Sequence, residues 1–278
     1  MSTDVVLTIV IVNYNSGEHL RECIRSIHAS GTQTRFRVEV VDNGSRDGSP
    51  ELPAGEYPLV NLTRNRKNVG FGSANNQVFR SVQGTRYFLA LNPDIVVTPG
   101  SLDTMCRFMD EHPEVGICGC RLLNPDGSLQ FSCRTWPHPL TILLRGLQVE
   151  KLFPENRRFL DYYMRDWDHG ERAEVDWVLG SCMMIRRALC SELGGFDERF
   201  FMYYEDVDLA LRAWHAGWKV VYIPDVHMLH HHKQESHSWR SPRVLFQHIR
   251  SAVHFFSKHR FFRSFLTGRP KISRRIKR

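Results

Sequence analysis

The fold is indicated first by one segment near the N-terminus, which reads Leu-Thr-Ile-Val-Ile-Val at residues 7–12. This uninterrupted run, rich in β-branched residues, is typical of a strand that is buried on both faces of a parallel sheet. Residues 18–29 follow it with apolar side chains at helical spacing and are predicted to form a helix. The chain therefore begins with a buried strand and an amphipathic helix.

The alternation of strand and helix continues outward from this segment. Further strands are predicted at residues 36–41, 59–62, 87–91 and 115–118, and further helices at residues 73–82 and 102–111. Alternation of this kind predicts an α/β fold with a Rossmann-like, mostly parallel sheet flanked by helices.

The second half of the chain is less uniform. Residues 122–174 are rich in Pro, Arg and aromatic residues and show little periodicity, so we expect a loop-rich insertion that carries specificity. Order returns at residues 175–186, and a helix is expected within residues 200–212. The last strand is predicted at residues 219–223, where Pro224 ends it.

Three polar clusters directly follow predicted strands. They are Asn13-Tyr14-Asn15, Asp42-Asn43-Gly44-Ser45 and Asn92-Pro93-Asp94. Ligands of open α/β sheets bind beyond the carboxyl ends of the strands, so we expect the clusters to meet at one site. Asp42 could accept hydrogen bonds from a nucleobase or ribose, and Asp94 could hold Mg²⁺ or Mn²⁺. The clusters that contain Asp42 and Asp94 are also typical of simple turns.

Three further motifs could carry chemistry. The glycine-rich residues 68–76 open a predicted helix that could receive a phosphate, but they match neither a P-loop nor a dinucleotide fingerprint. Glu205, Asp206 and Asp208 lie in one turn at a helix start, where they suit either a general base or the helix dipole. Histidines follow the last predicted strand, and they suit either a metal ligand or a solvated loop.

The net charge of +7 is unevenly distributed. Residues 226–278 carry thirteen Lys and Arg residues against a single acidic residue, whereas residues 1–225 are net negative. Within residues 243–266 apolar side chains recur at helical spacing between the bases, which predicts a basic amphipathic helix. Such a helix suits an anionic membrane surface, or it packs on the rest of the chain. A nucleic-acid-binding function is disfavoured because no nucleic-acid motif accompanies the basic tail.

Several classes of protein are excluded by composition. No apolar run approaches the ~18 residues that span a bilayer, and the N-terminus lacks the features of a signal peptide. The seven cysteines show no zinc-site spacing, so we expect reduced thiols and a cytoplasmic protein.

Five segments in this order resemble family 2 of the inverting glycosyltransferases, which have the GT-A fold. They are residues 10–15, 41–45, 68–76, 91–94 and 194–208. The resemblance covers about residues 6–236 and is closest to bacterial rhamnosyltransferase-like members. It implies one catalytic domain at residues 1–236, followed by the basic amphipathic helical tail at residues 237–278.

The resemblance also implies roles for individual residues. Asp206 matches the catalytic base, with Glu205 beside it. The nucleotide-sugar donor would be bound by Asn13, Asn15, Asp42, Asn43, Asn68, Gly70, Asn75, Asn92 and Asp94. The acceptor would lie near Trp177, Gly180 and Ser181. Asp94 and His230 would hold the metal ion, although Asn92 stands where the family's metal motif has its first Asp.

The activity that the resemblance implies is an inverting sugar transfer that depends on Mg²⁺ or Mn²⁺. The expected donor is dTDP-rhamnose, and the expected acceptor is a glycan or a polyprenyl-linked sugar of cell-surface polysaccharide synthesis. The tail would place the protein on the inner face of the cytoplasmic membrane. Two alternatives remain open: a UDP- or GDP-sugar as donor, and a protein that binds nucleotide sugars without turnover.

Overall fold

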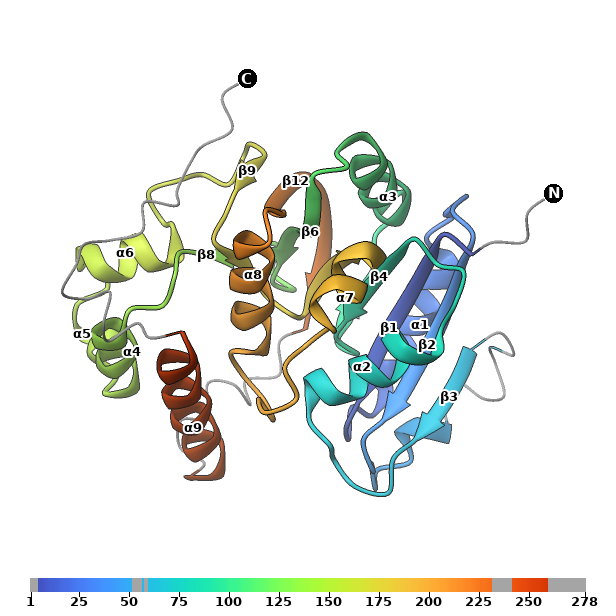
Figure 1. Cartoon of the computed structure of the whole chain (residues 1–278), viewed down its shortest axis with the longest axis horizontal. Helices are drawn as coiled ribbons and strands as arrows, with labels where there is room; N and C mark the ends of the chain where they lie inside the picture. Colours follow the sequence, from blue (N-terminus) through green and yellow to red (C-terminus); the bar gives the residue numbers. More distant parts are fainter. Residues whose placement is uncertain (1–4, 52–56, 58–59, 232–241, 260–278) are drawn as a thin grey trace.

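The computed structural model of the chain describes residues 5–51, 57, 60–231 and 242–259. In these residues a ten-stranded sheet forms the centre of the molecule (Figure 1). Its main strand order is β3 (Val60–Arg64), β2 (Phe36–Asp42), β1 (Leu7–Asn13), β4 (Tyr87–Leu91), β11 (Cys182–Arg186), β6 (Val115–Leu123), β12 (Lys219–His230) and β5 (Ile95–Val96). β7 (Leu129–Gln130) pairs with β6, and β9 (Ala173–Glu174) pairs with β12.

Strand direction confirms the prediction of a mostly parallel sheet. β3, β2, β1 and β4 are parallel to their neighbours, as are β6 and β12. β11 is inserted antiparallel between β4 and β6. The short strands β5, β7 and β9 are also antiparallel to the strands that they pair with. The carboxyl ends of the parallel strands therefore share one edge of the sheet.

Helices cover both faces of the sheet, which explains the apolar character of the first strand. The helices α1 (Glu18–Ala29) and α3 (Ser101–Glu111) share one buried cluster with Ile9 and Ile11. The opposite face packs Val10 with α2 (Phe71–Ser81), α7 (Arg187–Leu193) and α8 (Glu205–His215). Successive residues of β1 are thus buried on alternate faces, as a doubly covered strand requires.

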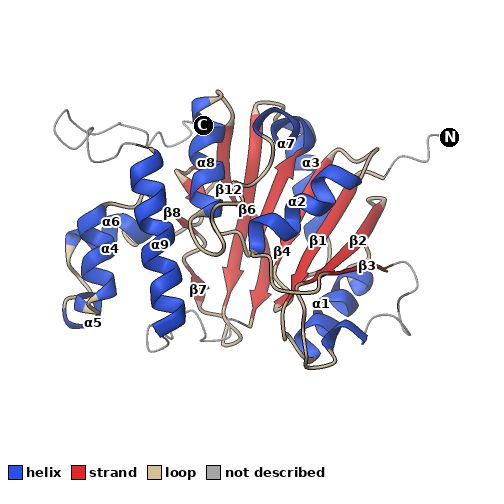
Figure 2. Ribbon diagram, turned by 60° about the horizontal axis from the view of Figure 1, so that its bottom comes forward, coloured by secondary structure: helices blue, strands red, loops and turns tan. Residues whose placement is uncertain are grey.

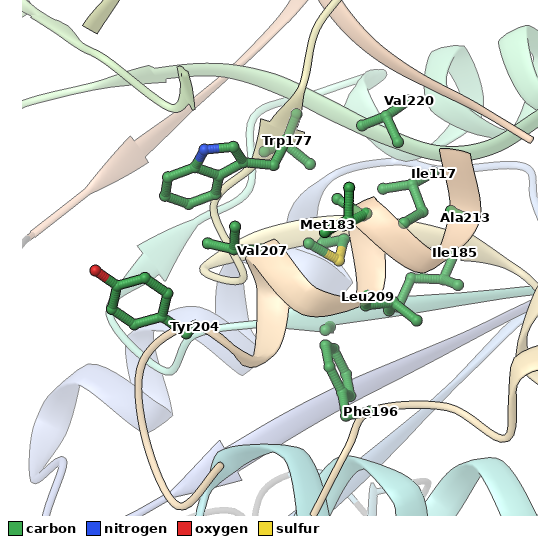
Figure 3. Packing of buried hydrophobic residues seen from close by; sticks show 14 of the residues in the cluster. Ile117, Trp177, Met183, Ile185, Phe196, Tyr204, Val207, Leu209, Ala213 and Val220 are labelled. Carbon is green, nitrogen blue, oxygen red and sulfur yellow. The ribbon is translucent and has the colours of Figure 1, made fainter. Parts of the chain in front are cut away.

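α8 is anchored firmly against the sheet. Figure 3 shows Val207, Leu209 and Ala213 of this helix among apolar side chains of the sheet, which include Met183 and Ile185. Because these side chains are buried, the start of α8 has a defined position relative to the sheet.

The segment at residues 122–174 differs from the predicted loop-rich insertion. It contains α4 (Pro139–Gly146), α5 (Val149–Leu152), α6 (Arg157–Tyr163) and β8 (Cys133–Arg134), which pairs with β10 (Trp177–Val178). These three helices lie together beyond one end of the sheet (Figures 1 and 2). They are four to eight residues long, too short for a periodic pattern to identify them.

The last strand was predicted to end at Pro224, and this prediction is wrong. β12 continues to His230, and its pairing with β6 shifts register between Ile223 and His227. Pro224 lies within this irregularity, where a missing N–H breaks no ladder hydrogen bond. His227 and His230 therefore belong to the strand and not to a loop after it.

The described part of the basic tail is α9 (Pro242–Lys258), which packs against the start of α8. Phe255 and Phe256 are buried beside Tyr204, and the Ser251 hydroxyl donates a 2.8 Å hydrogen bond to the carbonyl of Met202. The opposite side of the helix exposes large apolar side chains: Phe246, Ile249 and Val253. Residues 237–241 and 260–278 of the predicted tail lie outside the described residues.

Two further observations concern the whole described chain. Apart from a short 3₁₀ helix, η1 (Ser49–Glu51), every described helix is α-helical, and none of them has the length and apolarity to cross a membrane. All seven cysteines are buried and free of disulfides, in agreement with the prediction of reduced thiols.

Candidate active site

A cleft of about 820 Å³ lies between the edge of the sheet and the segment that carries α4–α6. Several of the predicted site residues line it: Asn15, Asn92, Asp94, Trp177, Gly180, Ser181, Glu205, Asp206 and His230. They come from the ends of β1 and β4, from the approach to β11, from the start of α8 and from the end of β12. Folding therefore brings together residues that are up to 215 positions apart.

Asp206 has a well-defined position at the first turn of α8. Its carboxylate accepts hydrogen bonds from the backbone N–H groups of Gly180 at 3.0 Å and Val207 at 2.8 Å. The preceding residues, Tyr203 and Tyr204, have φ values of 69° and 70°, a left-handed conformation that is uncommon outside glycine. Such a strained conformation persists only where the surrounding packing enforces it, and it is often found at functional sites.

The two neighbouring acids have different electrostatic surroundings. Burial raises the pKa of Asp206, but the two N–H groups and the positive charge of Arg134 oppose that rise. Burial raises the pKa of Glu205 well above its usual range, and the negative charge of Asp206 raises it further. The surroundings therefore favour the carboxylate form at Asp206 more than at Glu205, which makes Asp206 the better candidate to accept a proton.

A second pair of residues, Asp94 and His230, faces the cleft. Asp94 Oδ1 and His230 Nε2 are 3.3 Å apart. The side-chain N–H₂ of Gln130 donates to the His230 carbonyl at 3.0 Å and to Asn124 Oδ1 at 2.7 Å, which directs Gln130 Oε1 to His230 Nδ1 at 2.8 Å. Nδ1 therefore donates to Gln130 Oε1, and Nε2 is the ring nitrogen on the side of the Asp94 carboxylate.

This geometry fits a divalent cation. A carboxylate oxygen and an imidazole nitrogen that lie together at the cleft are ligand atoms that a divalent cation can bind. Within the described ranges, no cluster of three or more His, Cys, Asp or Glu side chains is arranged to bind a metal. Mg²⁺ and Mn²⁺ suit such a sparse set because substrate phosphates and water supply their other ligands.

The remaining predicted donor residues do not line the cleft, and they support its edge. They are Asn13, Asp42, Asn43, Asn68, Gly70 and Asn75. The Asn13 amide donates to Asp42 Oδ1 at 2.9 Å, and Asp42 Oδ2 accepts from the N–H groups of Gly44 and Ser45 at 3.2 Å each. These bonds organise the turn after β2, while a donor-binding role for its residues stays a prediction.

The glycine-rich segment is similarly engaged within the protein. The Asn43 amide contacts Asn68 Oδ1 and the Gly70 carbonyl at 3.3 Å each, and the Asn75 amide donates to the Phe71 carbonyl at 3.0 Å. A side chain at Gly70 would place its Cβ 2.4 Å from the carbonyl oxygen of Phe201, at a φ of 91°. Only glycine allows this close approach of the segment before α8.

One side of the cleft is a wall of mainly basic and aromatic side chains that was not predicted from the sequence. Its members are Arg134, Arg145, Glu150, Tyr162, Tyr163 and Arg165, all from the segment that was predicted to be loop-rich. The abundance of Arg and aromatic residues in that segment was the available signal. Their convergence depends on three short helices that the periodicity does not reveal.

Asp176 lies under this wall and leads to a prediction about pH. Its carboxylate accepts a 2.6 Å hydrogen bond from the Trp136 N–H, and burial raises its pKa from 3.8 to about 7. The folded chain thus favours the protonated form, and it loses stability relative to the unfolded chain as pH rises from about 4 to about 7. Above that window, we expect Asp176→Asn to raise the free energy of unfolding by about 1–2 kcal/mol or more.

Urea unfolding of both proteins at about pH 4 and about pH 8 measures this difference. The advantage of the variant should be largely lost at the lower pH, which lies close to the unfolded-state pKa of 3.8 and well below the folded-state pKa of about 7. An equal advantage at both values would contradict the assignment.

Comparison with known proteins identifies the family. The family described as Glycosyl transferase family 2 matches residues 8–194, two thirds of the chain. The chain belongs to this family. The match contains the polar strand ends of β1, β2 and β4 and the approach to β11, but it ends before α8 and His230. As a member of family 2, the protein is a glycosyltransferase.

Curated relatives extend the similarity beyond the family match. An N-acetylglucosaminyl-diphospho-decaprenol L-rhamnosyltransferase of Mycobacterium tuberculosis is 35% identical over 239 residues, which cover 81% of this chain and 76% of that protein. The rhamnosyltransferase WbbL of Escherichia coli is 24% identical over 272 residues, which cover 91% of this chain and 93% of that protein. This chain is therefore a rhamnosyltransferase-like member of family 2.

Solved structures agree on the fold. The mannosyltransferase PcManGT from Pyrobaculum calidifontis, solved in complex with GDP-Man and Mn²⁺, superposes with a TM-score of 0.60 at 21% identity. The similarity covers 89% of this chain but 64% of that one, so the chain spans less than two thirds of the solved protein. At this identity the likeness shows the GT-A fold.

Proposed function

We propose that this family 2 glycosyltransferase moves rhamnose from dTDP-rhamnose to a lipid-linked N-acetylglucosamine diphosphate. The site observation that carries this proposal is the position of Asp206, whose carboxyl group accepts two backbone N–H groups on the wall of a cleft that also contains Asp94 and His230. The choice of sugar and acceptor is supported by the 35% identical relative, whose name states that it transfers rhamnose to such an acceptor.

The proposed reaction is a single displacement. Asp206 takes the proton from an acceptor hydroxyl while the oxygen of that hydroxyl forms a bond to the anomeric carbon of rhamnose. The bond between this carbon and the diphosphate oxygen breaks on the opposite face, so the anomeric configuration inverts. The products are dTDP and the new glycoside, and the proton remains on Asp206 until water accepts it.

Asp94 and His230 would hold Mg²⁺ or Mn²⁺, which would neutralise charge on the leaving diphosphate as a Lewis acid. Gln130 keeps the His230 ring in the orientation that this task needs. A leaving group of this kind needs no protonation, so one carboxylate base is sufficient, in contrast to glycoside hydrolysis.

The tail and the location of the protein complete the proposal. Residues 1–236 would be the catalytic domain, and residues 237–278 would contact an anionic membrane at the inner face of the cytoplasmic membrane. The exposed Phe246, Ile249 and Val253 on α9, together with the basic residues around and after this helix, support such contact. A membrane-bound acceptor would make the contact useful.

The proposal predicts metal-dependent release of nucleotide diphosphate. We would incubate the protein with dTDP-rhamnose, UDP-sugars or GDP-sugars and a lipid-diphosphate N-acetylglucosamine, with Mg²⁺, Mn²⁺ or EDTA. We expect release of dTDP from dTDP-rhamnose, and a fall of about 100-fold or more with EDTA or in His230→Gln. The matched control is His227→Gln, an exposed residue of the same strand outside the cleft.

Each alternative has a distinct result. Release from a UDP- or GDP-sugar would replace the proposed donor. Calorimetric binding of a nucleotide sugar without any product would favour a binding protein without turnover. Full activity in EDTA would contradict the proposed metal role of Asp94 and His230.

A further inference from the structure

Three arginines converge on one tyrosine at the basic wall of the cleft. Arg134 of β8, Arg145 of α4 and Arg165 after α6 place their guanidinium carbons 4.9, 5.3 and 4.8 Å from the centre of the Tyr163 ring. Arg134 also stacks on Trp177, and Arg165 on Phe131. Contact with several rings holds each guanidinium in place, and its N–H donors point outward in the plane of the guanidinium group.

The charge of this group is not balanced by the described residues. Glu150 pairs with Arg145 at 3.4 Å and with Arg165 at 3.3 Å, whereas no described carboxylate lies within ion-pair distance of Arg134. The Nε atoms of Arg134 and Arg165 are buried and have no hydrogen-bond partner in the described part of the chain. Glu150 and, near Arg134, Asp206 are the carboxylates beside these three guanidinium groups, so positive charge remains in excess. Excess positive charge in a largely buried place is costly unless an anion completes it.

A neighbouring histidine responds to this positive field. The pKa of His248, on α9, is lowered to about 4 by burial and by the charges of Arg145 and Arg134. His248 lines the same cleft and therefore adds no positive charge near neutral pH. The local field is that of the arginines.

The position of the arginines within the cleft relates them to the acceptor. Arg134 is near enough to Asp206 to lower its pKa, and it contacts Trp177 beside the Gly180 hydrogen bond. The elements that carry the arginines lie at the end of the sheet remote from β1, β2 and β3 (Figures 1 and 2). The arginines are thus beside the proposed base and away from the strand ends predicted to bind the nucleotide.

We infer that Arg134, Arg145 and Arg165 bind the diphosphate of the lipid-linked acceptor. This inference rests on the proposed function. A diphosphate group carries the negative charge that the wall lacks, and planar guanidinium groups bind phosphate oxygens through paired N–H donors. With the diphosphate in this place, the attached sugar would extend toward Asp206.

The helices that carry and follow Arg145 also have an exposed apolar surface. α4, α5 and the residues that flank them expose large apolar side chains: Leu143, Leu147, Leu152 and Phe153. Gln148 and Lys151, between them in sequence, line the cleft itself. The surface would cover the first isoprene units of an acceptor whose diphosphate lies against the arginines.

The experiment compares two acceptors that differ in the diphosphate alone. Farnesyl-diphospho-N-acetylglucosamine carries it, and the farnesyl glycoside of the same sugar does not. We expect Arg134→Gln and Arg165→Gln to lower the ratio of kcat/KM between the two acceptors about tenfold or more. Arg158→Gln, an exposed arginine of α6 outside the cleft, is the matched control and should keep the wild-type ratio.

Binding of a second probe separates this inference from the proposed function. Farnesyl diphosphate should bind about tenfold or more weakly to both variants than to the wild-type protein, while the affinity for dTDP stays the same. Arg134→Lys retains the charge, so its affinity for farnesyl diphosphate should lie between those of the wild-type protein and Arg134→Gln. This variant keeps the test valid if Arg134→Gln folds poorly. Wild-type binding of farnesyl diphosphate without transfer to either acceptor would overturn the proposed acceptor but support the diphosphate site.

Three outcomes would overturn the inference. Equal losses with both acceptors would mean that the arginines support the fold or the sugar. A loss of dTDP affinity in place of farnesyl diphosphate affinity would assign the arginines to the donor. Unchanged binding of farnesyl diphosphate in both variants, with transfer by the wild-type protein intact, would leave the proposed function standing without this site.

Discussion

Asp206→Asn is expected to lower kcat for sugar transfer about 10³-fold, because the amide cannot accept the proton of the acceptor hydroxyl. The side chain keeps its shape, and its Oδ atom can still accept the hydrogen bond from Gly180 or from Val207. The affinity for the nucleotide-sugar donor should therefore change little. Steady-state kinetics with donor and acceptor, together with calorimetric donor binding, measure the two quantities separately.

Glu205→Gln is the matched control for this experiment. Glu205 is buried at 6% exposure, and its raised pKa keeps it protonated, so glutamine imitates the form already present. We expect a loss of less than about tenfold, compared with the usual 10²–10⁴-fold contribution of a general base. If Glu205→Gln lost as much activity as Asp206→Asn, the assignment of the base within this pair would be wrong.

Asp208→Asn is expected to lower the free energy of unfolding by about 3–5 kcal/mol. The Asp208 side chain is fully buried and accepts hydrogen bonds from Arg212 Nε and His259 Nε2 at 2.7 Å each, as well as from Lys258. Burial alone would raise the pKa of Asp208, but the bonds from His259, Arg212 and Lys258 outweigh it and lower the pKa. The substitution removes the negative charge of Asp208, so the positive charges of Arg212 and Lys258 lose their carboxylate partner.

Two measurements test this prediction. Urea unfolding gives the loss of stability, and Asp225→Asn, which breaks an exposed ion pair with Arg172, should cost less than about 1 kcal/mol. Because Lys258 and His259 belong to the end of α9, hydrogen exchange should also increase first in α9. The stabilisation by Asp208 should be lost as pH falls below about 4, since a depressed carboxyl pKa stabilises the fold above that range.

The strands and helices around the first half of the sheet could be predicted from local sequence. β1, α1 and β4 lie within one residue of their predicted bounds, because a strand covered on both faces needs a continuous apolar run. The end of β12 could not be predicted in this way. Pro224 normally interrupts a strand, and the irregular pairing with β6 that accommodates it depends on a neighbour about 100 residues away.

The candidate site divides in the same manner. The strand-end motifs that contain Asp94 and the acidic turn that contains Asp206 were visible in the sequence, since each is a short continuous pattern. The pKa of Asp206 could not be predicted from the sequence, because it depends on burial, on the Gly180 N–H and on the charge of Arg134. The arginines of the basic wall belong to no short sequence motif, so their convergence could not be predicted from the sequence.

The alternation of strands and helices, the polar residues at the ends of the strands and the basic tail could all be recognised in the amino-acid sequence alone. These are properties of neighbouring residues, and hydrophobic periodicity records them directly. Three features follow from the tertiary structure alone: the pKa of Glu205 is raised beside Asp206, His230 faces Asp94, and three arginines surround Tyr163. Charge, protonation and ligand geometry depend on distances through space, and close packing sets these between segments far apart in the chain.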